Sequence, residues 1–266
     1  MAICWLLMQS FVQVWRRALL FTRAGALTFT TILALVPLLV AIAAIFSVLP
    51  IAVSWQVTLQ HFLFSHFVVS SGQTIQRYLA FFVARAWQLS SVSLGFLALN
   101  TFGLLFSIEQ SLNAIWGVGA RTWYRALGLY LVILGIIPAL LILSLGLSFL
   151  ASHARWLTQL ALPLHKIPMV WPLSLSFIAY AVLFKMMPHT YVSKASAVVS
   201  ALIAAWLFEG LKHGFNCYVL LFSNYERIYG AVAAVPLFFL WLYCCWVILL
   251  SAGVCGYLWQ RHRGAK

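Results

Sequence analysis

Three ionisable side chains lie close together in a long apolar run, in the stretch WLFEGLKHGF from Trp206 to Phe215. They are Glu209, Lys212 and His213. Charge inside a bilayer is costly, so an ionisable group there is by default a candidate functional site. The other chemistry open to this trio is an ion pair from Glu209 to Lys212 or His213, three and four positions away, that holds the helices together.

Four polar residues share one face of a helix that turns about 100° per residue: Glu209, Lys212, His213 and Asn216. If the span begins at Ala195, Glu209 lies roughly 21 Å along it, in the outer third of the membrane core. Lys212 can extend its ammonium to the interface, whereas the shorter Glu209 cannot. We therefore expect this face to point into protein or a water-filled cavity rather than into lipid.

A second polar position is Asn100, near the middle of another apolar segment. Asn100 either forms a hydrogen bond between helices or lines a wet face opposite Glu209. Glu109 lies on the other side of the same predicted helix, near its cytoplasmic end, where Arg121 or Arg125 can pair with it.

Proline interrupts three of the predicted spans, at Pro37, Pro138 and Pro236. Each proline removes one backbone hydrogen bond, and the freed carbonyl needs another partner in lipid. These positions are either ordinary kinks in a helix bundle or hinges beside a cavity.

Most catalytic patterns are missing from this sequence. It contains no aspartate, and its glutamates are Glu109, Glu209 and Glu226, so a carboxylate cluster for two metal ions is hard to build. No phosphate-binding loop, nucleophile elbow or dinucleotide fingerprint is present. We therefore expect neither an enzyme nor a bound metal or cofactor.

Composition places the chain among membrane proteins, because 65% of its 266 residues are hydrophobic and only 7% are charged. The net charge of +13 is best explained by basic residues that flank spans and meet anionic lipid headgroups. We therefore expect membrane lipids, and no nucleic acid, as partners.

The sequence predicts an all-α fold, with one membrane domain over residues 1–266 and six spans. The spans are placed near 24–49, 91–112, 126–151, 167–187, 195–217 and 230–258. An interfacial helix is expected at 4–21, with Trp5 and Trp15 at headgroup depth. Ten basic residues fall inside and six outside if the N-terminus is cytoplasmic, which favours two cytoplasmic termini. The first outer loop, 53–88, contains helical apolar spacing and is predicted to form amphipathic helices.

Four stretches in order resemble the YihY/BrkB family of bacterial inner-membrane proteins, once labelled ribonuclease BN. They are ALTFTTILALVPLL (26–39), EQSLNAIWGV (109–118), MPHTYVSKASAVVSALIAAWLFEGLKHGFNCYV (187–219) and YERIYGAVAAVPLFFLWLY (225–243). The family's motif positions fall here on Pro37, Asn113, Trp116, Pro188, Glu209, Lys212, Tyr229, Gly230, Pro236 and Trp241. One departure concerns an acid that such proteins often carry in the last span, where this chain reads Gly253-Val254-Cys255-Gly256.

The resemblance implies six spans with both termini in the cytoplasm. It also suggests the handling of lipid or another amphipathic envelope solute. An alternative is a scaffold that docks an envelope protein through its outer amphipathic helices. The ribonuclease activity of the historical label fits this sequence poorly, because metal-ligand clusters are lacking and basic residues are dispersed.

Overall fold

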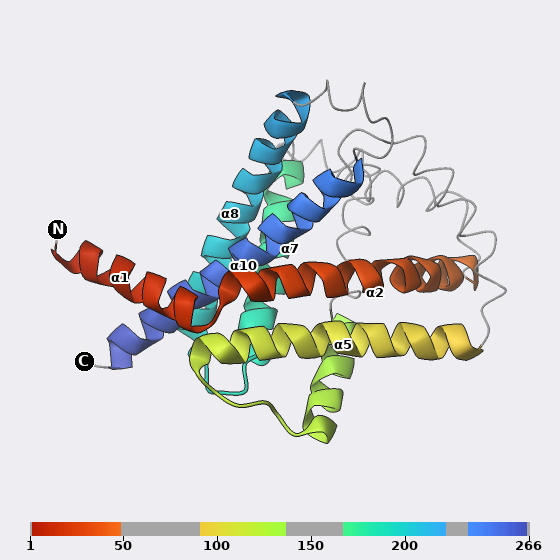
Figure 1. Cartoon of the computed structure of the whole chain (residues 1–266), viewed down its shortest axis with the longest axis horizontal. Helices are drawn as coiled ribbons and strands as arrows, with labels where there is room; N and C mark the ends of the chain where they lie inside the picture. Colours follow the sequence, from red (N-terminus) through yellow and green to blue (C-terminus); the bar gives the residue numbers. More distant parts are fainter. Residues whose placement is uncertain (1, 49–90, 137–166, 222–233, 265–266) are drawn as a thin grey trace, which may run out of the picture. The chain divides into compact units, whose positions relative to one another are not determined.

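The computed structural model describes residues 2–48, 91–136, 167–221 and 234–264. Within these ranges every regular element is a helix, so the all-α prediction is confirmed there (Figure 1). The labelled helices are α1 (Ala2–Arg17), α2 (Leu20–Val48), α5 (Ser91–Trp116), α7 (Ile167–Met186), α8 (Lys194–Leu221) and α10 (Ala234–Gly264). A further apolar helix covers Trp123–Ile136.

Two stretches of the described chain, Lys194–Tyr218 and Val235–Arg263, are long and apolar enough to cross a membrane, judged by length and composition. Shorter apolar helices cover Leu20–Ala34, Trp123–Ile136 and Ser176–Met186. Six spans therefore stay a prediction. The amphipathic helices expected at 53–88, together with Pro138, Tyr229 and Gly230, lie outside the described residues.

The chain forms two compact units. The first comprises Met1–Arg23, Ile108–Gly210 and Val247–Lys266, and the second comprises Ala24–Ser107 and Leu211–Trp246. The prediction of a single membrane domain is not tested by this division and stays a prediction.

Local backbone geometry explains where two helices end. At the end of α5, Gly117 has φ 67° and the Val118 N–H donates to the Asn113 carbonyl at 3.0 Å. This bond is the hallmark of a Schellman cap, in which glycine adopts the left-handed conformation without a steric penalty. The helix α1 ends at Arg17, short of the predicted residue 21, because Leu19 turns the chain with φ 49° before α2 begins.

Close packing between α8 and α10 organises the first unit. The Ser196 hydroxyl donates to the Gly256 carbonyl at 2.7 Å, and a Cβ on Gly256 would lie 1.9 Å from Ser200 Oγ. Ser196 and Ser200 are buried. Small residues allow two helix backbones to approach in this way, and a hydroxyl can then bond across the interface.

The first unit also joins α5 and α7 to α10. A Cβ on Gly253 would meet Leu112, Ile115 and Phe184 at 3.3–3.4 Å. Leu112 and Ile115 are fully buried. In the second unit, Trp246 of α10 donates to Thr31 of α2 at 3.1 Å.

Candidate functional site

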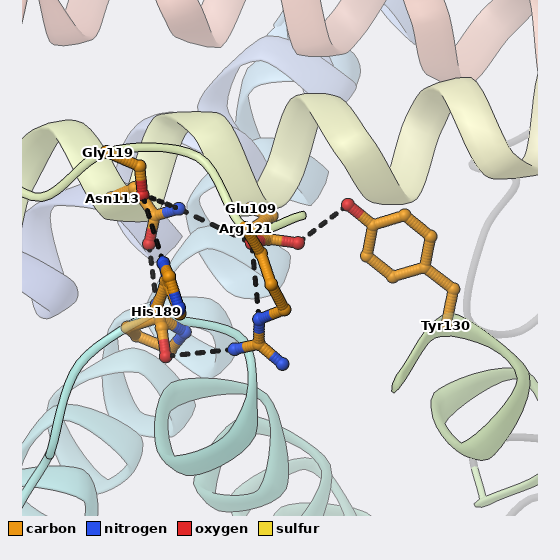
Figure 2. Close-up of polar contacts among 7 residues, drawn as sticks. Glu109, Asn113, Gly119, Arg121, Tyr130 and His189 are labelled. Carbon is orange, nitrogen blue, oxygen red and sulfur yellow. Dashed lines mark hydrogen bonds and ion pairs between the residues drawn. The ribbon is translucent and has the colours of Figure 1, made fainter. Parts of the chain in front are cut away.

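A carboxylate buried within the first unit is the centre of its most extensive polar cluster among the described residues. Glu109 lies on α5 and is only 2% exposed. The Tyr130 hydroxyl donates to Glu109 Oε2 at 2.7 Å, and Arg121 Nε lies 3.6 Å from Oε1 (Figure 2). A buried charge is tolerated when it is paired and hydrogen-bonded, and Glu109 meets both conditions. The sequence predicted Arg121 or Arg125 as the partner of Glu109, and the structure shows that it is Arg121.

Asn113, one helical turn after Glu109, extends the cluster to the segment that follows α7. Its side-chain oxygen accepts a hydrogen bond from the backbone N–H of His189 at 2.7 Å. Its amide nitrogen lies 3.5 Å from Glu109 Oε1 and 3.4 Å from the Gly119 carbonyl. Asn113 is 2% exposed, so these partners satisfy a side chain that water does not reach.

Arg121 makes a second connection, because its Nη2 donates to the Pro188 carbonyl at 3.4 Å. We call five residues the Glu109 cluster: Glu109, Asn113, Arg121, Tyr130 and His189. Together they join α5, the loop after it, the helix Trp123–Ile136 and the segment between α7 and α8 (Figure 2).

The chemistry of the Glu109 cluster indicates a structural role. Both carboxylate oxygens face donors of the protein itself, and none of the five members is a serine, threonine or cysteine nucleophile. Across the described residues, no three His, Cys, Asp or Glu side chains gather in a group that could hold a metal ion. The cluster therefore fixes four segments relative to one another.

Two arginines from the junction of α1 and α2 contact the end of α5. Arg17 Nη2 donates to the Ile115 carbonyl at 3.2 Å, and Arg23 Nη1 donates to the Gln110 carbonyl at 3.4 Å. The Ile115 carbonyl lies in the last turn of α5, where carbonyls lack partners within the helix and cations are favourable. These bonds attach the N-terminal segment to the same end of the unit as the Glu109 cluster.

The predicted polar face on α8 lies at the border between buried and exposed surface. Glu209 and Lys212 are half-buried, whereas His213 and Asn216 are exposed. Toward the start of α8 the same face continues through Ala205, which is buried, and then Leu202 and Val198, which are 46% and 41% exposed. That this face points into protein or a water-filled cavity stays a prediction.

The remaining predicted polar and hinge positions that the structure describes belong to the second unit, whereas the Glu109 cluster belongs to the first. Asn100 is half-buried, and its side-chain amide donates to the Phe96 carbonyl of its own helix at 2.7 Å. Pro37 lies within α2, which continues through it. Pro236 is the third residue of α10, and the residues before Ala234 lie outside the described chain. The hinge role of these prolines stays a prediction.

Motif positions of the resemblance are found in both units. Asn113 belongs to the Glu109 cluster, and the Pro188 carbonyl accepts a hydrogen bond from Arg121. Trp116 packs edge-on against Tyr257 with ring centroids 5.3 Å apart. In the second unit, Trp241 packs against Phe215 with centroids 5.0 Å apart.

Sequence reasoning missed two members of the Glu109 cluster. A phenol in an apolar segment usually finds a hydrogen-bond partner, so the position of Tyr130 was an available signal. His189 gave none, because its bond to Asn113 uses the backbone N–H, which every residue except proline possesses.

Comparison with known proteins places this architecture in context. The chain matches a family model described as "Virulence factor BrkB" over residues 11–266. A UPF0761 membrane protein of Legionella pneumophila is 36% identical over 247 residues, which cover 91% of this chain and 60% of that protein. The UPF0761 membrane protein YihY of Escherichia coli is 35% identical over 195 residues, which cover 73% of this chain and 67% of that protein.

A UPF0761 membrane protein of Cronobacter sakazakii is 34% identical over 230 residues, covering 86% of this chain and 80% of that protein. The chain spans only about 60% of the length of the two Legionella pneumophila relatives that it matches. None of these names states a catalytic activity. No solved structure matches the chain.

Proposed function

Since this chain belongs to the BrkB family of membrane proteins, we propose that it moves or holds lipids or other amphipathic solutes in the bacterial inner membrane. ATP hydrolysis by the chain itself is not part of this function, because the sequence contains no phosphate-binding loop. The chemistry therefore consists of binding and passage rather than bond cleavage.

The observation that carries this proposal is the position of Glu209. It lies on α8, a helix long and apolar enough to span a membrane, and its side chain is half-buried. One turn before it, Trp206 is 68% exposed, and Leu202 on the same face is 46% exposed. A carboxylate thus borders an exposed apolar surface.

An amphipathic solute matches this combination of surfaces. Its apolar tail can lie along Leu202 and Trp206, as it does among lipid chains, while a cationic or hydrogen-bonding headgroup meets Glu209. Carboxylates within a span are costly and usually face a pathway or a partner. A purely structural Glu209 remains the competing role, and the experiment below separates the two.

The test is reconstitution into liposomes that contain a fluorescent phospholipid, with lipid movement followed by quenching from outside. The variant is Glu209→Gln, which removes the charge and keeps the shape. The matched control is Glu226→Gln, the same exchange at a glutamate of a predicted outer loop. Thermal unfolding in detergent is measured for each protein.

We expect Glu209→Gln to abolish lipid movement at an unchanged unfolding temperature, while Glu226→Gln stays active. A lower unfolding temperature for Glu209→Gln would instead assign Glu209 a structural role. The function itself is wrong if wild-type protein moves neither lipid nor amphipathic dye faster than empty liposomes.

Both chain ends are proposed to lie in the cytoplasm. The last turn of α10 carries Arg261, His262 and Arg263, and the last turn of α1 carries Arg16 and Arg17. Basic residues next to span ends favour the cytoplasmic side. A reporter that is active only in the periplasm, fused after Lys266, should stay inactive, and activity there would reverse the orientation.

A further inference from the structure

Three cations of the first unit each lie over an aromatic ring. The pairs are Arg125 with Tyr124, Lys185 with Tyr191, and Arg263 with Trp259. The cation lies 5.8, 4.8 and 4.8 Å from the ring centroid, in that order. The rings are 56%, 76% and 40% exposed, so all three pairs reach the surface. We call them the basic–aromatic pairs.

Hydrogen bonds show that the basic–aromatic pairs lie at one end of the unit. Arg121, in the loop before Arg125, donates to the Pro188 carbonyl at 3.4 Å. Gln260, beside Trp259, accepts from the Ser193 N–H at 2.8 Å and donates to the Tyr191 carbonyl at 2.9 Å. The start of the helix Trp123–Ile136, the segment between α7 and α8 and the end of α10 therefore meet.

This end of the unit is strongly positive. Six Lys and Arg side chains of the unit are exposed: Arg16, Arg17, Arg125, Lys194, Arg261 and Arg263. Of the two glutamates described in the unit, Glu109 is buried against Arg121, and Glu209 lies far along α8. No exposed carboxylate of the described residues therefore balances these cations, and the surface suits an anionic partner.

The aromatic rings favour a membrane over other anionic partners. Tyr and Trp concentrate at the level of lipid headgroups, where the apolar ring and the polar tip are both accommodated. Trp123, beside the first pair, is 79% exposed, as is typical of a ring at such an interface. Lys185 also donates to the Val192 carbonyl, but an ammonium has three N–H groups and can bind a phosphate as well.

We propose that the basic–aromatic pairs bind the phosphates of anionic phospholipids in the leaflet at this end of the unit, with the rings at the headgroup level. This binding does not depend on lipid transport through Glu209. Each cation near an anionic membrane contributes about a fivefold gain in affinity, so loss of three should weaken binding about 100-fold.

The experiment uses the full chain in a nonionic detergent. Dioleoylphosphatidylglycerol or dioleoylphosphatidylcholine is titrated into the micelles, and the rise in unfolding temperature gives the half-saturating lipid fraction. The test variant is the triple exchange Arg125→Gln, Lys185→Gln and Arg263→Gln. A control of equal charge loss carries three exchanges at predicted outer-loop residues outside the described chain: Arg77→Gln, Arg85→Gln and Arg155→Gln.

Each variant is compared with its own lipid-free unfolding temperature, because Lys185→Gln also removes the bond to Val192. The double exchange Arg125→Gln and Arg263→Gln leaves that bond in place. We expect wild type and control to prefer phosphatidylglycerol, the double variant to need about 25-fold more of it, and the triple variant about 100-fold more.

Two results would overturn the proposal. One is a half-saturating fraction that is the same in the triple variant and the control. The other is a soluble anion acting in place of lipid: inorganic phosphate or a 20-nucleotide RNA that raises the wild-type unfolding temperature as far as phosphatidylglycerol, with loss of the effect in the triple variant.

Discussion

Replacing Glu109 with glutamine tests whether the buried ion pair holds the first unit together. The exchange leaves a side chain of the same shape, whose amide oxygen can still accept from the Tyr130 hydroxyl. The amide NH2 then faces Arg121, a donor against a donor, at the place where Oε1 now lies 3.6 Å from Nε. Arg121 is left with a charge and no carboxylate.

The expected magnitude follows from burial. Removing one partner of a buried ion pair costs about 3–5 kcal/mol. The Arg121 side chain is 17% exposed and would keep its hydrogen bond to the Pro188 carbonyl. The lower end of this range therefore applies, and we expect a loss of about 3 kcal/mol. Arg121→Met should cost a similar amount, because it leaves the Glu109 charge buried. The double variant loses both charges and should cost about 3 kcal/mol rather than 6.

The measurement is unfolding in mixed micelles with increasing dodecyl sulfate, followed by tryptophan fluorescence and circular dichroism. Tyr130→Phe serves as the control, since it removes one hydrogen bond but keeps the ion pair and should cost only about 1–2 kcal/mol. Additive costs in the double variant, about 6 kcal/mol, would refute the coupling between Glu109 and Arg121.

Three backbone predictions use the same unfolding assay. Gly256→Ala should destabilise the protein by about 2 kcal/mol, because its Cβ would lie 1.9 Å from Ser200 Oγ. The control Gly25→Ala, whose Cβ would meet nothing within 4 Å, should change stability little. Equal effects of the two exchanges would contradict the close helix packing. Gly117→Ala should cost about 1–2 kcal/mol, since alanine pays for φ 67°, and no loss would argue against the left-handed cap. Leu19→Gly should be neutral or stabilising by up to about 1 kcal/mol, because glycine adopts φ 49° without strain and the Leu19 side chain is 63% exposed. A clear loss of stability would show that the contacts of the leucine side chain outweigh the backbone strain.

The positions of the helices were largely predictable. Long apolar runs gave segments whose described helices begin within a few residues of the predicted starts, as with Ser91 for α5 and Lys194 for α8. A break between the first helix and the first span was predicted at 22–23, but the structure places it at 18–19. Its position depends on a left-handed Leu19, a conformation that leucine seldom adopts. Gly117 was a visible signal for the end of α5, since glycine commonly follows the last helical turn.

The candidate sites were predictable only in part. Opposite charges near one predicted span end were enough to suggest that Glu109 pairs with Arg121 or Arg125, and the structure selects Arg121. The sequence pointed more strongly to Glu209, because a carboxylate in the middle of an apolar run is conspicuous. The structure shows a polar cluster around Glu109, which includes a tyrosine hydroxyl and a backbone amide. Neither group carries a charge that would make it conspicuous in the sequence.

Composition and periodicity by themselves determined that this chain is a helical membrane protein with a basic surplus. Four stretches in order indicated its family, and the family match over residues 11–266 confirms it. Only the tertiary structure decided that Tyr130 reaches Glu109 and that the His189 N–H reaches Asn113, across 21 and 76 positions of sequence. The physical reason is that helical spacing states which residues share a face. It does not state which other segment packs against that face, and the partner decides whether a buried charge is satisfied.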